Sequence, residues 1–201
     1  MEEQYLKDIS EIKNMMSKSS QFISLSGFSG IIAGIYALIG AFVAHQLIEN
    51  HEGTYITWES TTFRLIALTA FLVFLLSVIT TGMLTYSKAK KHGEKVWNAT
   101  SRRLMVNFLI PLVTGGIFAL LLLRHEHYEL IAPVTLLFYG MACVNASKYT
   151  LRDVRYLGLT VIILGLIATE FIGYGIQFWA MGFGVCHILY GTIMYYKYDR
   201  K

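Results

Sequence analysis

The chain has too few charged residues for a water-soluble domain. Only 15% of its 201 residues are charged and 55% are hydrophobic, whereas about a quarter of the residues in soluble domains are charged. The mean hydropathy is positive, at +0.51. This composition excludes most soluble enzymes and indicates a protein that lies almost entirely in a membrane.

Proline and cysteine are also scarce, with two residues of each. Cys143 and Cys186 both fall within apolar runs, so we expect small packing residues here rather than a disulfide or a thiolate metal site.

The GxSxG and HExxH motifs of common hydrolases are absent from the sequence. His187 has no second histidine at matching depth with which to bind a haem. The sequence therefore predicts no cofactor in the membrane core.

Long apolar runs make up most of the chain. Each is about 20 residues long, which as a helix spans the ~30 Å of a bilayer core. We therefore predict an all-α protein with a single six-helix transmembrane domain over 22–196. A short amphipathic helix is expected over 1–21, where apolar residues recur at helical spacing, and a short basic tail over 197–201. The six runs cover 22–44, 63–86, 104–123, 129–147, 154–176 and 177–196.

Lysine and arginine are distributed unevenly around these runs. Fifteen of the 17 basic residues fall in the N-terminal segment, the loops over 87–103 and 148–155, and the C-terminal tail, which leaves only Arg64 and Arg124 for the other side. Basic loops remain cytoplasmic in membrane proteins. The distribution predicts that both termini are cytoplasmic, in a multi-pass protein of the cell membrane.

Small residues recur every four positions in two of the runs. Such rows let helix backbones approach closely inside a membrane. We expect them to pack helices together within one bundle, the alternative being an interface in a homo-oligomer. One row comprises Ser26, Gly30 and Gly34, and the other comprises Gly165, Thr169 and Gly173.

Two ionisable residues, Glu170 and His187, are expected inside the hydrocarbon layer. They lie on the fifth and sixth runs, which a very short turn joins, so the two side chains are expected to come within reach of each other. Ionisable groups in a membrane usually face the protein interior and often mark a pathway for protons or ions. The pair is therefore a candidate proton or substrate site, the alternative being two neutral side chains that are hydrogen-bonded within the bundle.

The loops on the side opposite the basic residues are rich in histidine and acidic residues. His51 lies in the first of these loops, and His125, His127 and Glu129 lie in the second. Imidazole and carboxylate groups are ligands for zinc, copper or nickel. A transition-metal site at these loops is therefore one hypothesis, and a solvated polar loop is the simpler alternative.

These features favour a small protein that moves or senses a small solute or ion through a polar site on the fifth and sixth helices. One alternative is a non-transporting membrane subunit or regulator that binds a partner protein. Another is a membrane enzyme acting on lipid, with Glu170 and His187 as acid and base. The basic loop over 87–103 is expected to attract anionic lipid, and nucleic acid is not an expected partner.

Overall fold

A computed structural model describes residues 5, 21–51, 56–57, 59–91, 93 and 96–200. Within these residues the structure is helical and contains no strand, which confirms the predicted all-α class. The amphipathic helix expected over 1–21 lies outside the described residues, apart from Tyr5 and Gln21.

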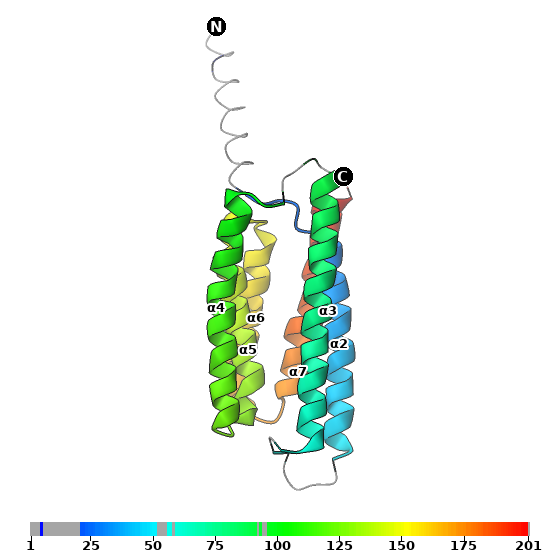
Figure 1. Cartoon of the computed structure of the whole chain (residues 1–201), viewed down its shortest axis with the longest axis vertical. Helices are drawn as coiled ribbons and strands as arrows, with labels where there is room; N and C mark the ends of the chain where they lie inside the picture. Colours follow the sequence, from blue (N-terminus) through cyan, green and yellow to red (C-terminus); the bar gives the residue numbers. More distant parts are fainter. Residues whose placement is uncertain are drawn as a thin grey trace.

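Six helical rods lie side by side in the described part of the chain (Figure 1). Five are α-helices, and the sixth is a continuous series of α- and π-helical segments over Gly175–Asp199, which we name the C-terminal rod. The five helices are α2 (Gly27–Glu49), α3 (Thr61–Lys91), α4 (Ala99–Arg124), α5 (Ile131–Ala146) and α6 (Asp153–Glu170). The rod consists of α7 (Gly175–Trp179), η3 (Ala180–Val185), α8 (Cys186–Met194) and η4 (Tyr195–Asp199). Short 3₁₀ helices precede and follow α5, at η1 (Tyr128–Leu130) and η2 (Ser147–Tyr149).

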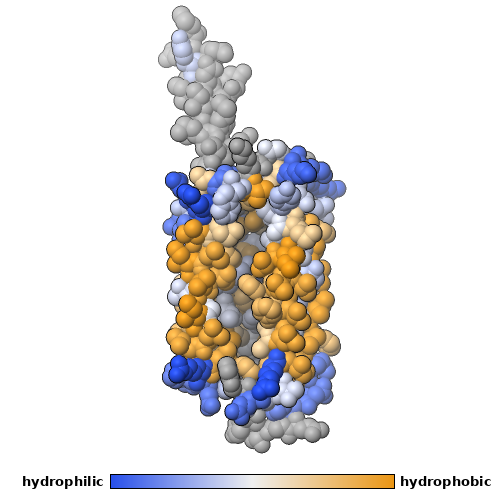
Figure 2. Space-filling model, viewed as in Figure 1, coloured by the Kyte–Doolittle hydropathy of each residue, from blue (hydrophilic) through white to orange (hydrophobic). Residues whose placement is uncertain are grey.

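The surface of the bundle suits a membrane. Figure 2 shows a broad hydrophobic belt between two hydrophilic ends. Among the described helices, α2, α3, α4, Tyr128–Tyr149 and the C-terminal rod are each long and apolar enough to cross a bilayer. The remaining helix, α6, is apolar in its middle but carries Asp153, Arg155 and Glu170 near its two ends. These properties agree with a multi-pass membrane protein.

The rods form two groups. α2 packs against α3 and against the C-terminal rod, while α5 packs against α4 and α6. We name these the α2 group (α2, α3 and the rod) and the α5 group (α4, α5 and α6). The rod also contacts α5 and α6, so it joins the two groups along the bundle.

Glycines bring α2 and the C-terminal rod into close contact. A Cβ atom added to Gly34 would lie 2.7 Å from the carbonyl oxygen of Gly184, and one added to Gly30 would lie 3.2 Å from the Cα of Gly191. The row that begins at Ser26 therefore packs helices within the bundle, as predicted. Of the second row, Gly165 packs against Leu137 of α5, whereas Thr169 is exposed.

The first predicted helix begins later than the hydropathy suggested. The segment over 22–26 is extended, and its alternate residues Phe22, Ser24 and Ser26 are buried. The backbone N–H of Phe22 donates to the carbonyl oxygen of Tyr149 at 2.7 Å, and the Thr150 hydroxyl donates to the carbonyl oxygen of Phe22 at 2.7 Å. This segment thus crosses the end of the bundle and fastens α2 to the loop between α5 and α6.

The fifth predicted helix ends earlier than expected. The run over 154–176 predicted a helix through Ile176, but α6 ends at Glu170 and the chain then turns through Gly173, whose φ is +97°. Glycine is the residue that adopts this conformation without steric cost. The turn places Glu170 at the tip of its helix rather than within it.

Carboxylates join the rods at the end of the bundle that carries Lys88 and Lys197, which we name the lysine-rich end. Oδ2 of Asp199 accepts from the backbone N–H of Gly27 at 2.9 Å and from the Ser26 hydroxyl at 3.2 Å, while Oδ1 accepts from Nζ of Lys88 at 2.5 Å. One carboxylate thereby binds the positive end of the α2 dipole and a lysine of α3.

Asp153, the first residue of α6, makes a second such contact at the lysine-rich end. Its Oδ2 accepts from Nζ of Lys197 at 3.0 Å and from the hydroxyl of Tyr198 at 2.7 Å. The terminal π-helix η4 is therefore tied to α2 and α3 by one carboxylate and to α6 by another.

Candidate functional site

The structure gives His187 of α8 two hydrogen-bonding partners in the bundle interior. The side chain is buried, its Nδ1 lies 3.0 Å from the carbonyl oxygen of Gly182, and its Nε2 lies 2.6 Å from the hydroxyl oxygen of Tyr139. Because a carbonyl oxygen only accepts hydrogen bonds, Nδ1 carries the proton. When the imidazole is neutral, Nε2 accepts from the Tyr139 hydroxyl.

A π-helix positions the first of these partners. The Gly182 carbonyl lies within η3, the π-helical segment that directly precedes α8. His187 comes five residues after Gly182 in the sequence. Segments of π-helix are rare and occur often at functional sites. Gly182 itself has no room for a side chain, because an added Cβ would collide with Leu136 of α5. The backbone of η3 at Gly182 thus lies against the Leu136 side chain of α5.

Aromatic rings surround the histidine. Its ring centroid lies 5.3 Å from that of Tyr139 and 6.0 Å from that of Phe183, against which it stacks. Phe183 in turn contacts Trp179 at 4.9 Å, and Tyr139 contacts Phe108 of α4 edge-on at 6.0 Å. We name these five residues the histidine–aromatic cluster. Its members come from α4, α5 and the C-terminal rod, so the cluster lies where the two groups of helices meet.

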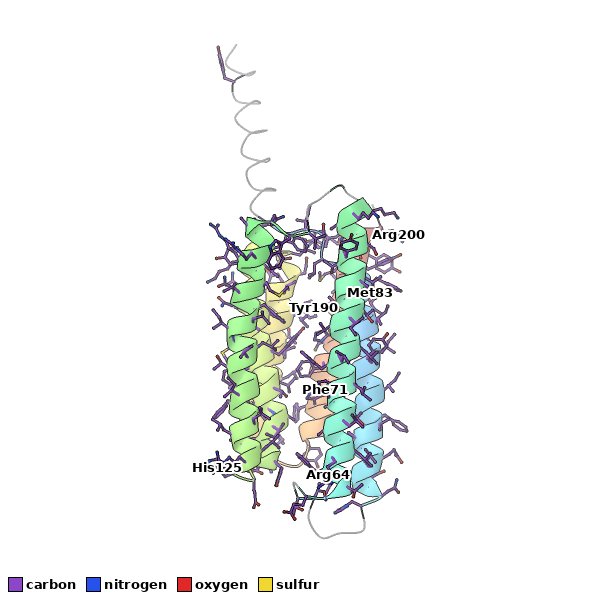
Figure 3. All side chains as sticks on the ribbon, in the orientation of Figure 1. Arg64, Phe71, Met83, His125, Tyr190 and Arg200 are labelled. Carbon is purple, nitrogen blue, oxygen red and sulfur yellow. The ribbon has the colours of Figure 1, made fainter. Side chains whose placement is uncertain are left out.

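A second polar contact joins the rod to α6. The hydroxyl oxygens of Tyr190 and Thr160 lie 3.1 Å apart. In the view of Figure 3, Tyr190 lies between α3 and α4, and Figure 2 shows that the molecular surface is hollowed between the α5 group and α3.

Glu170 takes no part in the contacts of His187. It is exposed at the end of α6, and no hydrogen bond or ion pair is recorded between it and any residue that the structure describes. Both ring nitrogens of His187 are bonded to Gly182 and Tyr139 instead. Glu170 and His187, which the sequence predicted to be neighbours, therefore make no contact. α6 ends at Glu170, before the turn, and His187 faces α5.

Two histidines of the histidine-rich loops have nearby partners among the described residues. His51 lies 2.9 Å from the Thr62 hydroxyl, and Nδ1 of His127 lies 3.6 Å from Oε1 of Glu129. His125 is exposed directly after α4. Over the described ranges, no three histidine, cysteine or acidic side chains converge to hold a metal ion. A metal site formed by these residues therefore stays a prediction.

Tyr139 is the member of the histidine–aromatic cluster that contacts His187 and that the sequence did not single out. It lies in the middle of an apolar run, where tyrosine is commonly a packing residue, and its partner is 48 positions away. A buried tyrosine hydroxyl needs a hydrogen-bond partner, so its mid-run position was a usable signal. The two cysteines are buried, and each lies in a hydrophobic cluster, as expected of packing residues.

Comparisons with protein-family models, with curated proteins and with solved structures found no match to this chain.

Proposed function

We propose that this chain is a cell-membrane protein that moves or senses a small solute or ion through the histidine–aromatic cluster. The observation that carries the proposal is the partly buried hydrogen bond between His187 and Tyr139, which joins the α5 group to the C-terminal rod. Buried polar residues in membrane helices commonly mark a substrate or ion pathway.

The proposed topology has six crossings with both ends in the cytoplasm. Five described segments are apolar enough to span a membrane, and α6 supplies the sixth because its charged residues are near its ends. α2 begins and the C-terminal rod ends at the same end of the bundle (Figure 1). That end carries most of the basic residues, as the cytoplasmic side of a membrane protein does.

The proton is the ion best suited to this site. If Nε2 of His187 gains a proton, it becomes a donor, and the Tyr139 oxygen can accept from it once the hydroxyl hydrogen rotates away. The two heavy atoms, 2.6 Å apart, need not move. The hydrogen bond can thus form in both protonation states of His187, with the tyrosine as donor in one and the histidine as donor in the other. A proton can therefore enter and leave without a rearrangement of the helices.

Proton flux into liposomes tests this proposal. The purified protein is reconstituted around a pH-sensitive dye, and a pH gradient is imposed with potassium and valinomycin to balance charge. We expect flux above that of empty liposomes, loss of this flux in His187→Gln, and a reduction of about tenfold in Tyr139→Phe. Tyr36→Phe is the control, because Tyr36 lies 3.4 Å from Thr80, outside the cluster. Wild-type flux equal to that of empty liposomes would contradict proton transport.

A second candidate is a non-transporting subunit that binds another membrane protein, or a second copy of the chain, through α3. Ala89 is the only residue of α3 that is buried, and side chains such as Phe71, Phe74 and Met83 are largely exposed. A photo-reactive amino acid at Phe71 is expected to give one protein adduct of defined mass in cells, whereas one at Leu166 of α6 gives lipid adducts. Lipid adducts at both positions would contradict this candidate.

The lipid-enzyme alternative has less support. It needs an acid and a base that act together, but Glu170 is exposed at the tip of α6 while His187 is bonded to Tyr139 and Gly182.

A further inference from the structure

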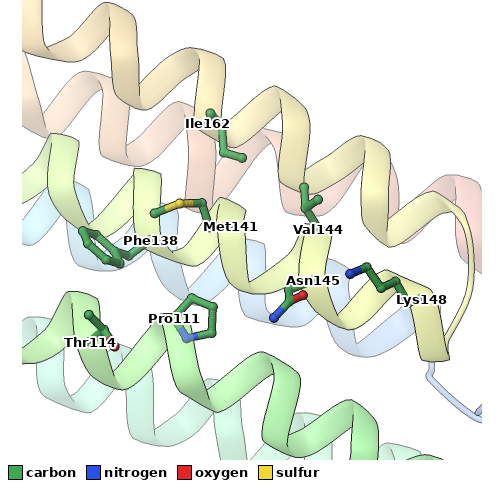
Figure 4. A pocket seen from close by; sticks show the side chains of 8 residues that line it. All are labelled: Pro111, Thr114, Phe138, Met141, Val144, Asn145, Lys148 and Ile162. Atoms are coloured by element: carbon green, nitrogen blue, oxygen red, sulfur yellow. The ribbon is translucent and has the colours of Figure 1, made fainter.

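A groove lies on the α5 group, separate from the histidine–aromatic cluster (Figure 4). Its volume is about 390 Å³. Pro111 of α4, Phe138 and Met141 of α5, and Ile162 of α6 line most of it, and Met141 is 39% exposed to the surroundings. The groove is thus mostly apolar and opens on the side of the bundle that would face lipid.

Proline helps to form this groove and gives it one polar wall. Pro111 has no N–H, so the carbonyl oxygen of Asn107, four residues earlier, loses its usual helical donor. Nδ2 of Asn145 donates to this oxygen at 3.0 Å, which joins α5 to α4. An amide group has two N–H bonds, and this contact uses one of them. The second amide hydrogen remains available at the edge of the groove, where Asn145 is a lining residue.

A lysine lies at the end of the groove nearest the lysine-rich end of the bundle. Lys148 lines the groove and is exposed, and no carboxylate partner is recorded for it among the residues that the structure describes. Lys88 and Lys197, at the same end of the bundle, are each paired with an aspartate. Lys148 therefore offers its positive charge to a group from outside the chain.

We propose that this groove binds a phospholipid with an anionic headgroup. One acyl chain lies along Pro111, Phe138 and Met141, and a phosphate oxygen accepts from Nζ of Lys148 and from the free amide hydrogen of Asn145. The apolar part of the groove corresponds to the acyl chain of the lipid. Lys148, near the end of the helices, corresponds to its headgroup. A net negative headgroup is favoured because the lining of the groove contains one cation and no carboxylate.

Native mass spectrometry of the purified protein tests this assignment. Phosphatidylglycerol and phosphatidylcholine with identical acyl chains are titrated separately into the protein in detergent. We expect phosphatidylglycerol to bind about fivefold more tightly, which is the factor expected from ~1 kcal/mol for one lysine at a membrane surface. Lys148→Gln should remove this preference. Lys90→Gln, which deletes an exposed lysine at the end of α3, should retain it.

A second variant tests the apolar part of the site. Met141→Trp places a larger side chain in the groove at an exposed position and should weaken both lipids, while the melting temperature remains that of the wild type. Glycerol phosphate, the headgroup without acyl chains, should not displace the bound lipid. Equal binding of the two lipids by the wild type would overturn the proposal, as would equal losses of preference in Lys148→Gln and Lys90→Gln, or unchanged binding in Met141→Trp.

Discussion

α2 and α3 are adjacent helices of similar apolarity, but α2 is partly buried in the bundle and α3 is almost entirely exposed. The most apolar windows of the two have mean hydropathies of 2.0 and 2.3, yet 28% of the residues in the α2 window are buried and none in the α3 window. Hydropathy therefore places both helices in the membrane but does not say which one packs in the bundle interior.

Small residues account for the difference. Gly30 and Gly34 of α2 lie against the backbone of the C-terminal rod, whereas Gly82 of α3 has no atom within 4 Å of an added Cβ. Lipid chains are as apolar as leucine, so helices in a membrane associate where small residues allow close packing. The pattern of small residues, more than the degree of apolarity, determines the neighbours of a helix.

The largest expected effect comes from a bulky residue at the close approach. Gly34→Leu would push a side chain into the Gly184 carbonyl and Ile188, and overpacking of this kind costs ~3 kcal/mol or more where backbone is the obstacle. We expect this variant to aggregate or to melt far below the wild type in detergent. Gly82→Leu on α3 is the matched control and should leave the melting temperature unchanged. If both variants melt alike, the comparison between α2 and α3 is wrong.

An intermediate effect is expected at Asp199, the carboxylate that α2 and α3 share. Its side chain is 10% exposed and that of Lys88 is 14% exposed. Removing one partner of such a pair costs up to ~3 kcal/mol, because Lys88 loses its carboxylate partner and the first N–H groups of α2 lose an acceptor. Asp199→Ala should lower the free energy of unfolding by this amount in denaturing detergent. Asp199→Asn, which keeps one acceptor oxygen, should lose about half as much; an equal loss would mean that the charge alone matters.

The smallest effects compare two tyrosines. Tyr139→Phe removes a hydrogen bond of 2.6 Å to a buried histidine, so we expect a loss of ~1–2 kcal/mol in the free energy of unfolding. Tyr36→Phe removes a contact of 3.4 Å between α2 and Thr80 of α3 and should cost under ~0.5 kcal/mol, since the bond is long. Equal costs would show that the contact between α2 and α3 is stronger than its geometry indicates.

The sequence predicted the helical class and most of the rods, since long apolar runs have few alternatives in a membrane. It was less accurate at the ends of the helices. The segment over 22–26 is apolar but extended, because it pairs with Tyr149 and Thr150, which are far away in the chain. Hydropathy does not distinguish such a segment from the first turn of a helix.

The candidate site was predictable in part. His187 was singled out from its position in an apolar run. Glu170 lies at the exposed end of α6 and outside the contacts of His187, because α6 ends before the turn. The contact between Asn145 and Asn107 follows from the missing N–H of Pro111 only once α5 is known to lie beside α4. The sequence shows which polar groups need a hydrogen-bond partner, but the partner itself depends on how the helices pack.

The pairing of α2 with the C-terminal rod also fixes an order of events during synthesis. Gly27 and Asp199 are 172 positions apart, and ribosomes add ~5–20 residues per second, so α2 is made on the order of ten seconds before its main neighbour. During this interval α3 is the first helix available to cover it. Until the rod is made, the glycine face of α2 lacks the backbone against which it packs in the finished bundle.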